Sequence, residues 1–363
     1  MDYSRDRILD FIREITERLA EYPLPWKVVP SFGICEVDNL DTPINVLCDW
    51  ANLALKTVKG SFLRRYAFYD DTLRQRILEE KNIENRMHEA LLEGQFTLHL
   101  QPKVDIATSR IVGSEGLVRW ERPGEGLLPP YKFIPLFERN GFIIHLDEYI
   151  WEQACILLRS WLDRGLEPCP ISVNMSRMHI HDPKLREKLV EMVRRYDLPP
   201  GLLEFELTES AFLENEEELF EAMRTLRRYG FRFSMDDFGS GYSSLNMLKS
   251  VVVDCIKIDR GFLNEEGTTE RGRTVIRFSI ALAQEMDIPV IAEGVETEEQ
   301  AAFLLEAGCS RAQGYFYSRP LPVPDFEALA FGTDSPFPVA PKIRAAAERM
   351  RDMRSGEERR SGS

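Results

Sequence analysis

Seven short apolar runs along the chain each end in a carboxylate, an amide or a lysine. Short runs rich in β-branched and aromatic residues predict strands, and helical periodicity predicts helices between most of them. We expect these helices near residues 145–164, 183–196, 216–229, 270–286 and 297–307. The polar residues at the ends of the runs are Glu115, Asn174, Glu206 with Glu209, Asp236 with Asp237, Lys257, Glu293 with Glu296, and Gln313.

A repeat of strand, polar end and helix is typical of a β/α barrel. An eighth run, FTLHLQPKVD at residues 96–105, carries Gln101 and starts the set, and SRAQGYFYSRP closes it. Only a few residues (IATSR) join the first two runs, which is too short for a crossover helix, so these strands should pair antiparallel. The sequence therefore predicts an α/β fold at residues 94–332, a TIM-like (β/α)8 barrel with an antiparallel first strand.

The residues before the barrel predict a smaller, incomplete α/β module at residues 1–70. It would combine a helix near 5–20, a strand in WKVVPSFGICEV, a helix at 44–59 and the short run RRYAFYD, which make a thin core. The charged segment 71–93 reads as a connecting or signalling helix, or as a helix packed on the barrel. Residues 333–363 turn rich in proline and arginine, which predicts a disordered tail or a frayed helix.

Composition narrows the class of function. A net charge of −14 argues against binding of polymeric nucleic acid, whose phosphates need clustered Lys and Arg. An anionic substrate is still possible if bound cations reverse the local field. No apolar stretch approaches the roughly 20 residues that span a bilayer, and MDYSRDRILDF does not resemble a signal peptide, so we expect a cytoplasmic protein without membrane insertion. The six scattered cysteines indicate neither a disulfide framework nor a zinc site.

The acidic strand ends predict a metal site. If the runs are barrel strands, five carboxylates meet at one mouth, where they repel one another unless protons or divalent cations compensate. Oxygen ligands without histidine favour Mg²⁺ or Mn²⁺ over Zn²⁺. The adjacent Asp236 and Asp237 can bridge two ions that clamp a phosphoryl group and activate a shared water. Lys257 can orient that water, and Arg119 can hold a second phosphate in a fork.

A single acidic residue is more often a solvated surface charge than a ligand. That reading does not explain why a charged or amide side chain follows every β-rich run, so we interpret the set as functional.

These residues resemble the EAL-domain family, bacterial phosphodiesterases that open cyclic diguanylate (c-di-GMP) to the linear dinucleotide pGpG. The motifs that carry the resemblance cover about residues 80–330, and they are QP at 101–102, EGLVRW, VNMS, ELTES, DDFGSGYSSL, IKIDRGF, AEGVE and QGYFYSRP. The resemblance implies a homodimer that forms through the barrel. It also implies ligands for two Mg²⁺ or Mn²⁺ ions, which would be Glu115, Asn174, Glu206, Asp236, Asp237 and Glu293.

The resemblance also implies roles for further residues. Lys257 matches the lysine beside the attacking water, and Glu293 matches a proposed general base. Glu209 and Glu296 match acids that support the loop after DDFGSGYSS, which the family links to dimerisation and activity. Contacts to substrate or water are implied for Gln101, Arg119 and Gln313.

Two residues depart from the family pattern. Gly116 stands where the name-giving triplet has alanine, and Leu100 replaces a common aromatic. We expect Gly116 to loosen its strand at a cost of about 0.5–1 kcal/mol and to slow turnover without removing metal binding. Residues 1 to about 70 resemble the carboxyl-terminal half of a GGDEF diguanylate-cyclase domain, but the signature loop is absent, so we expect a scaffold or a truncation rather than a catalyst.

Three functions stay open on sequence grounds. The first is a metal-dependent c-di-GMP phosphodiesterase, which the complete ligand set favours. The second is a c-di-GMP-binding sensor with weak or no hydrolysis, and the third is a module that only docks another protein.

Overall fold

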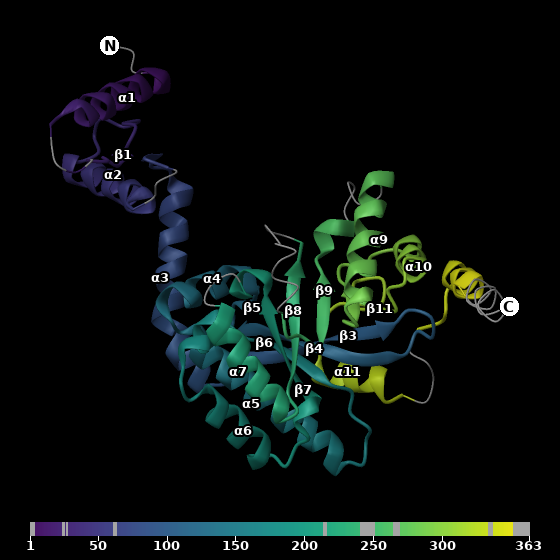
Figure 1. Cartoon of the computed structure of the whole chain (residues 1–363). Coiled ribbons are helices and arrows are strands. Elements are labelled where there is room, and N and C mark those ends of the chain that lie inside the picture. The colour runs from purple at the N-terminus through teal and green to yellow at the C-terminus, as the bar shows by residue number, and fades with distance from the viewer. Residues whose placement is uncertain are drawn as a thin grey trace. The chain divides into compact units, whose positions relative to one another are not determined.

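The computed structural model describes residues 4–23, 26, 28–60, 64–212, 216–239, 251–263, 269–332 and 337–350. The chain divides into two compact units, residues 1–89 and 90–363 (Figure 1). Helix α3 (Asp71–Leu92) carries the chain from the first unit into the second.

The first unit contains a pair of parallel strands, β1 (Phe32–Ile34) and β2 (Tyr66–Phe68). Helices α1 (Arg5–Glu21) and α2 (Ile44–Val58) lie where the sequence predicts them. Gly33 allows α2 to approach β1 closely, because a Cβ atom at this position would lie 1.9 Å from the carbonyl oxygen of Ala51. The resemblance of this unit to half of a cyclase domain stays a prediction.

Eight strands close into a barrel within the described part of the second unit, which confirms the predicted fold. The first strand, β3, pairs antiparallel with both of its neighbours, β4 and β11, whereas the other neighbouring strands around the barrel are parallel. In order around the barrel the strands are β3 (Phe96–Asp105), β4 (Ile111–Arg122), β6 (Ile171–Asn174), β7 (Leu203–Thr208), β8 (Arg232–Phe238), β9 (Cys255–Ile258), β10 (Val290–Ala292) and β11 (Arg311–Ala312).

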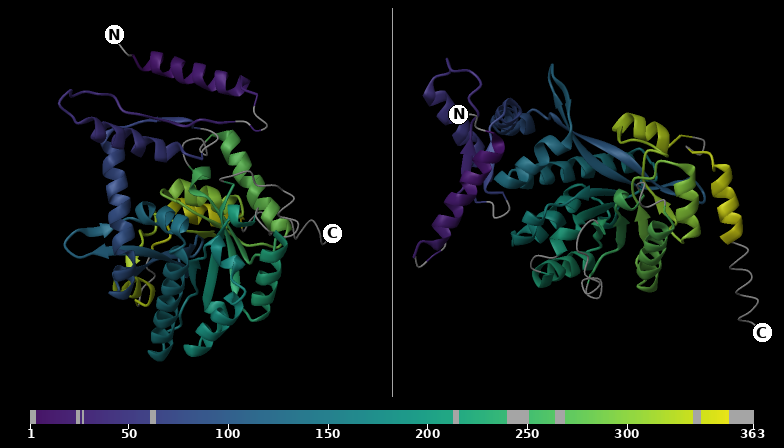
Figure 2. Two further views of the ribbon diagram at one scale, coloured as in Figure 1. Left: turned by 90° about the vertical axis from the view of Figure 1, so that its left-hand side faces the viewer. Right: turned by 90° about the horizontal axis from the view of Figure 1, so that it is seen from above.

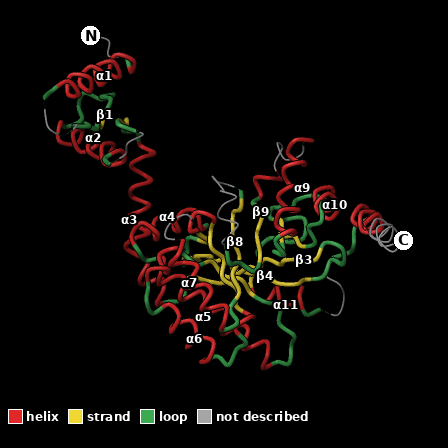
Figure 3. The backbone as a smooth tube through the Cα atoms, in the orientation of Figure 1, coloured by secondary structure: helices red, strands yellow, loops and turns green. Residues whose placement is uncertain are grey.

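Two short strands extend this sheet. β5 (Gly126–Leu128) pairs with the end of β4, and β12 (Leu321–Pro322) pairs with β3. Helices lie outside the central strands (Figure 2 and Figure 3). They are α4 (Pro130–Asn140), α5 (Ile143–Asp163), α6 (Leu185–Arg195), α7 (Glu216–Arg228), α9 (Glu270–Glu285), α10 (Glu298–Glu306) and α11 (Val323–Ala330), with short 3₁₀ turns η1 (Arg177–His181), η2 (Pro200–Leu202), η3 (Glu209–Phe212) and η4 (Arg260–Leu263).

The alternation of side chains along β7 explains how one strand builds both the core and the site. Successive residues of a strand point to opposite faces of the sheet. Phe205 points out of the barrel and packs edge-on against Trp151 of α5, with ring centroids 5.2 Å apart. Glu204 and Glu206, on either side of it, point inward, where both approach lysine. Apolar residues therefore hold the helices while polar residues fill the interior of the barrel.

The segment after the barrel differs from a wholly disordered tail. Residues 341–350 are helical, and the side chains of Ile343 and Ala346 are buried. Lys342 forms an ion pair with Glu299 of α10. Burial of two apolar side chains together with this ion pair gives the helix a packing partner, which the polar composition of the segment did not indicate. No helix in the part of the chain that the structure describes is long and apolar enough to cross a membrane.

Candidate active site

The barrel strands bring most of the predicted polar residues to one mouth, although Gln101 and Glu115 lie within the long strands β3 and β4 rather than at their ends. Parallel neighbours in a closed barrel end at the same face, so side chains at the ends of successive strands become neighbours in space. The elements that carry these residues are β3 for Gln101, β4 for Glu115, β6 for Asn174, β7 for Glu206, β8 for Asp236 and Asp237, β9 for Lys257, and the positions directly after β10 and β11 for Glu293 and Gln313.

Lys257 is at the centre of this arrangement and is fully buried. Its Nζ lies 3.2 Å from Glu115 Oε2 and 3.1 Å from Asp236 Oδ1. It also lies 2.5 Å from Glu293 Oε1 and in direct contact with Glu206 Oε2. A single ammonium group therefore neutralises part of the charge of four carboxylates that come from four different strands or strand ends.

A second lysine, Lys103, was missed by the sequence analysis. It is buried one layer deeper, where its Nζ lies 2.8 Å from Glu206 Oε1 and 3.5 Å from Glu204 Oε1. Ser234 donates a hydrogen bond to Glu204 in the same layer. The sequence holds a signal for it, because Lys103 follows Gln101 by two residues, and such residues share one face of a strand.

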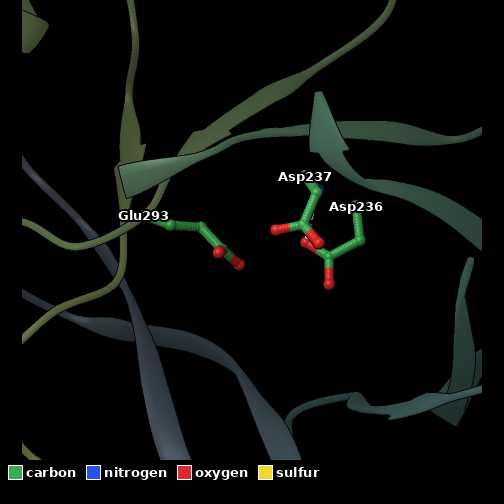
Figure 4. A group of neighbouring side chains, drawn as sticks. All are labelled: Asp236, Asp237 and Glu293. Atoms are coloured by element: carbon green, nitrogen blue, oxygen red, sulfur yellow. Dashed lines mark hydrogen bonds between the residues drawn. The ribbon is translucent and has the colours of Figure 1, made fainter. Parts of the chain in front are cut away.

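An irregular backbone lets Asp236 and Asp237 face the same mouth. Adjacent strand residues ordinarily point to opposite faces, but Asp237 has a φ of 55°, in the left-handed region that aspartate tolerates better than most residues. The register between β8 and β9 also shifts here, between Met235 and Phe238. As a result, oxygens of Asp236, Asp237 and Glu293 lie within 4.8 Å of one another (Figure 4).

Burial favours protonation of several of these carboxylates. Burial, reinforced by the charge of Glu206, raises the pKa of Glu115 above its usual value. Burial likewise raises the pKa of Asp236 and Asp237. The pKa of Glu293 rises to about 8, again chiefly because burial disfavours its charged form. Without metal ions, the site therefore tends to hold a proton at neutral pH.

Glu206 behaves in the opposite way. Burial favours protonation of its carboxyl too, but the charges of Lys103 and Lys257 outweigh that effect and lower its pKa to about 2. Burial likewise opposes the charge of Lys257, yet the surrounding carboxylates raise its pKa well above the ordinary value. Glu206 is therefore the permanently charged member of the cluster.

Two amide side chains lie beside Glu115. Gln313 Nε2 donates to Glu115 Oε2 at 2.6 Å and to Gln101 Oε1 at 2.9 Å. Gln101 is directly opposite Glu115 in the antiparallel pairing of β3 with β4, and its Nε2 donates to the carbonyl of Ser318 at 3.0 Å. These bonds orient the amides at the wall of the mouth.

A cleft of about 490 Å³ extends from the mouth, and Arg119, Asn174, Glu206 and Thr208 are among its lining residues. Arg119 is half-buried, and burial lowers the pKa of its guanidinium. The side chain of Asn174 is exposed, and its backbone pairs with that of Glu206 in the register of β6 and β7. The cleft thus joins the acidic cluster to a cationic group that can receive an anion.

The two remaining predicted residues lie apart from the cluster. Glu209 is buried in η3, and its Oε2 accepts a hydrogen bond from the backbone N–H of Gly239 at 2.8 Å. Gly239 has a φ of 90°, and a Cβ atom there would lie 2.2 Å from the ring of Phe262. Glu296 is exposed, and its backbone N–H donates to Gln300 Oε1. The loop that both acids are expected to support, residues 240–250, lies outside the described residues.

The donor set fits divalent cations of the Mg²⁺ class. It consists of carboxylates and one amide, all hard oxygen donors. The five carboxylates at the strand ends exceed the charge of Lys103 and Lys257, the two ammonium groups that contact them. The excess negative charge, together with the three converging carboxylates of Figure 4, makes a cation the natural complement of the mouth.

Gly116 has a packing role that the sequence did not reveal. A Cβ atom at this position would lie 2.9 Å from Leu98 Cδ1 and 3.3 Å from both Ser172 O and Val173 Cγ1. The side chain of Leu98 thus comes close to the place that a methyl group would occupy. The glycine next to Glu115 is enclosed by well-packed neighbours.

Comparison with known proteins shows which family this chain is similar to. Residues 84–320 match the EAL domain family. An uncharacterized signaling protein of Caulobacter vibrioides is 36% identical over 296 residues, which make up 81% of this chain and 36% of that protein. The cyclic di-GMP phosphodiesterase NbdA of Pseudomonas aeruginosa is 36% identical over 315 residues, 87% of this chain and 40% of NbdA. The chain thus spans well under half the length of these two relatives.

Solved structures share the barrel. The PaMucR phosphodiesterase in complex with c-di-GMP is 36% identical with a TM-score of 0.64, covering 68% of this chain and 99% of that chain. The c-di-GMP complex of the Xanthomonas citri FimX EAL domain is 22% identical with a TM-score of 0.63, covering 69% of this chain and 97% of that chain, and shows likeness of fold.

Proposed function

The chain belongs to the EAL domain family, and from this premise we propose that it hydrolyses c-di-GMP to linear pGpG with two divalent cations, Mg²⁺ or Mn²⁺. One observation carries the proposal. The carboxylates that the family motifs single out gather around one buried lysine at the mouth of a closed barrel. Relatives named as cyclic di-GMP phosphodiesterases, and a c-di-GMP complex at 36% identity, support the choice of substrate.

We assign the metal ligands to six residues of the mouth. Asp236, Asp237 and Glu293 place possible ligand oxygens within 4.8 Å of one another, so these residues would hold cations together. When bound, the ions would polarise the phosphate and lower the pKa of a water molecule. The ligands in this proposal are Glu115, Asn174, Glu206, Asp236, Asp237 and Glu293.

Side chains of this chain can hold the attacking water and take its proton. In hydrolysis the water oxygen forms a bond to phosphorus, the bond from phosphorus to one ester oxygen breaks, and that oxygen leaves with a proton from solvent. Lys257 donates hydrogen bonds at the centre of the mouth, so it can hold the water and offset charge that develops on phosphorus. Glu293, whose pKa is about 8 before cations bind, can accept the proton of the water in its deprotonated form, which bound cations would favour.

Substrate contacts fall to three further residues. Arg119 in the cleft can form paired hydrogen bonds to a phosphate. Gln101 and Gln313 offer amides at the wall beside Glu115, where they can orient the substrate or a water. In the same proposal Glu209 and Glu296 support the loop after Gly239, and the barrel forms a homodimer, which light scattering of the purified chain would test.

The test of this function is a product assay. The purified chain is incubated with c-di-GMP and Mn²⁺, and the nucleotides are separated by chromatography. We expect linear pGpG to appear with Mn²⁺ or Mg²⁺ and to be lost when a chelator is added. Glu115→Gln should abolish product formation, because it replaces a charged ligand by a neutral side chain of the same shape.

Glu121→Gln provides the matched control. Glu121 lies on the same strand, β4, but its side chain is 58% exposed. This variant should retain full turnover. Intact c-di-GMP that stays bound to the wild-type chain would favour the sensor function instead, and unchanged turnover in Glu115→Gln would refute the assigned site.

A further inference from the structure

Asn174 differs from the other assigned metal ligands in how it is held. It is neutral and exposed, and Lys257 contacts carboxylates rather than this amide. It is also the last residue of β6, where the regular ladder of the strand ends. Its side chain therefore depends on the backbone around it for its position.

Each of three consecutive residues at this point has a backbone group with a partner. Trp151 Nε1 donates to the carbonyl oxygen of Asn174 at 2.9 Å. The N–H of Met175 donates to the carbonyl oxygen of Glu206 at 2.9 Å. The N–H of Ser176 donates to Asp147 Oδ2 at 2.8 Å. Two of these three partners are side chains of one helix, α5.

Asp147 and Trp151 are four residues apart in α5, so they lie on the same face of the helix. Both are buried, with 7% and 1% of their surface exposed. His179 of η1 completes the arrangement. Its Nε2 lies 3.2 Å from Asp147 Oδ2, and its ring centroid lies 4.5 Å from that of Trp151. Helix α5 thus forms hydrogen bonds to the strand end on both sides of Met175, and His179 contacts both of the side chains that form them.

We propose that Asp147 and Trp151 are positioning residues that set the place of Asn174 as a metal ligand. This inference rests on the proposed function, because it assumes that Asn174 binds a cation. Side chains that orient a ligand without touching the metal commonly change metal affinity when they are removed. Neither residue belongs to the motifs that carry the family resemblance, and the arrangement is visible only in the fold.

The test uses substitutions that keep shape and remove one interaction. Trp151→Phe removes the indole N–H and keeps an aromatic ring, whereas Asp147→Leu removes the acceptor of the Ser176 N–H and keeps a branched side chain of similar size. Trp161→Phe is the matched control. Trp161 lies on the same helix, is fully buried, and donates its Nε1 hydrogen to Glu327 Oε1 at 2.7 Å, on α11. Loss of that bond leaves β6 untouched.

The measured quantity is the affinity of each metal-free protein for Mn²⁺ alone, from the electron paramagnetic resonance of free Mn²⁺ during a titration. We expect Trp151→Phe and Asp147→Leu each to weaken Mn²⁺ binding by roughly 10-fold. Trp161→Phe should bind Mn²⁺ like the wild type, even if its unfolding midpoint falls as much as that of Trp151→Phe. Turnover number for c-di-GMP should fall in the first two variants, while circular dichroism shows the same helix content.

The outcomes separate the two proposals. Wild-type Mn²⁺ binding and hydrolysis with unchanged affinity in both Trp151→Phe and Asp147→Leu would overturn the positioning role and leave the proposed function intact. Equal losses in Trp151→Phe and Trp161→Phe would overturn it too, because stability alone would then explain the effect. A wild-type chain that does not bind Mn²⁺ would overturn both.

Discussion

Lys103→Met removes one of the two ammonium groups that balance the acidic interior of the barrel. Lys103 Nζ lies 2.8 Å from Glu206 Oε1 and 3.5 Å from Glu204 Oε1, and the residue is 4% exposed. At an effective dielectric constant of about 20, these two contacts are worth roughly 6 and 5 kcal/mol before the cost of dehydration. Dehydration of the ammonium and the carboxylates offsets much of this gain.

The substitution leaves both carboxylates inside the barrel without that compensation. Breaking a buried pair by removing one partner typically costs about 3–5 kcal/mol, so we expect Lys103→Met to lower the free energy of unfolding of the metal-free barrel by that amount. The assay is urea unfolding near neutral pH, followed by tryptophan fluorescence, after a chelator has removed divalent cations. The barrel should unfold at a lower urea concentration than in the wild type.

Lys188→Met is the matched control. Lys188 also contacts two carboxylates, Glu148 and Asp182, but its side chain is 40% exposed. Because solvent screens exposed ion pairs, its loss should cost no more than about 1 kcal/mol.

Added Mn²⁺ provides a second test of the same reasoning. A cation at the mouth supplies part of the charge that Lys103 supplied, so Mn²⁺ should stabilise Lys103→Met more than it stabilises the wild type. Charge compensation would be refuted if Lys103→Met were no more costly than Lys188→Met. It would also be refuted if Mn²⁺ widened the difference from the wild type.

Three further predictions concern the mouth and its surroundings. Since the pKa of Glu293 is about 8, above the ordinary value of 4.5, the folded chain keeps a proton that the unfolded chain loses, and this contribution to stability falls as the pH rises from 4.5 to 8. A cation must displace that proton, so Mn²⁺ affinity measured by calorimetry should rise over the upper part of this range, and a flat profile would contradict the shift. Gly116→Ala should lower the unfolding free energy by about 1 kcal/mol through overpacking. In a chain that carries Leu98→Val, the same Gly116→Ala change should instead raise the unfolding free energy, as urea unfolding of the single and double variants would reveal. Gly239→Ala should cost more than Gly124→Ala in the same assay, because both have positive φ but only Gly239 would place its Cβ atom against an aromatic ring.

The barrel strands could be predicted from the sequence because their pattern is local. Each strand carries its own alternation or apolar run, and the residue at its end is polar, as in the run that ends with Glu206. The antiparallel first strand followed from the length of one connection. Helix α4 was not predicted, because Pro129, Pro130 and Pro135 break the usual helical pattern. The structure accommodates Pro130 in the first turn, where a missing N–H costs little.

The support of the site could not be predicted in the same way. The bond from Trp151 to Asn174 joins residues 23 positions apart, and it depends on the rotation of α5 against β6. A sequence pattern shows that α5 has an apolar face but not which side chain reaches a particular carbonyl. Lys103 could be predicted only in part. The alternation along its strand places its side chain inward, but its contact with Glu206 depends on closure of the barrel.

Because of Lys103 and Lys257, we expect cation binding to contribute less to the stability of this fold than it does in small metal-dependent domains. In small metal-dependent domains the metal supplies folding free energy, and the apo chain is unfolded. Here Lys103 and Lys257 neutralise Glu206 from both sides, and the raised pKa of Glu293 adds a proton. The metal-free barrel is therefore already partly compensated, so binding of cations at the proposed site would be an exchange in which Glu293 loses its proton and carboxylates turn from Lys257 to the ions. That exchange would free the ammonium of Lys257 to face a water at the centre of the mouth, which connects the stability of the barrel to its proposed chemistry.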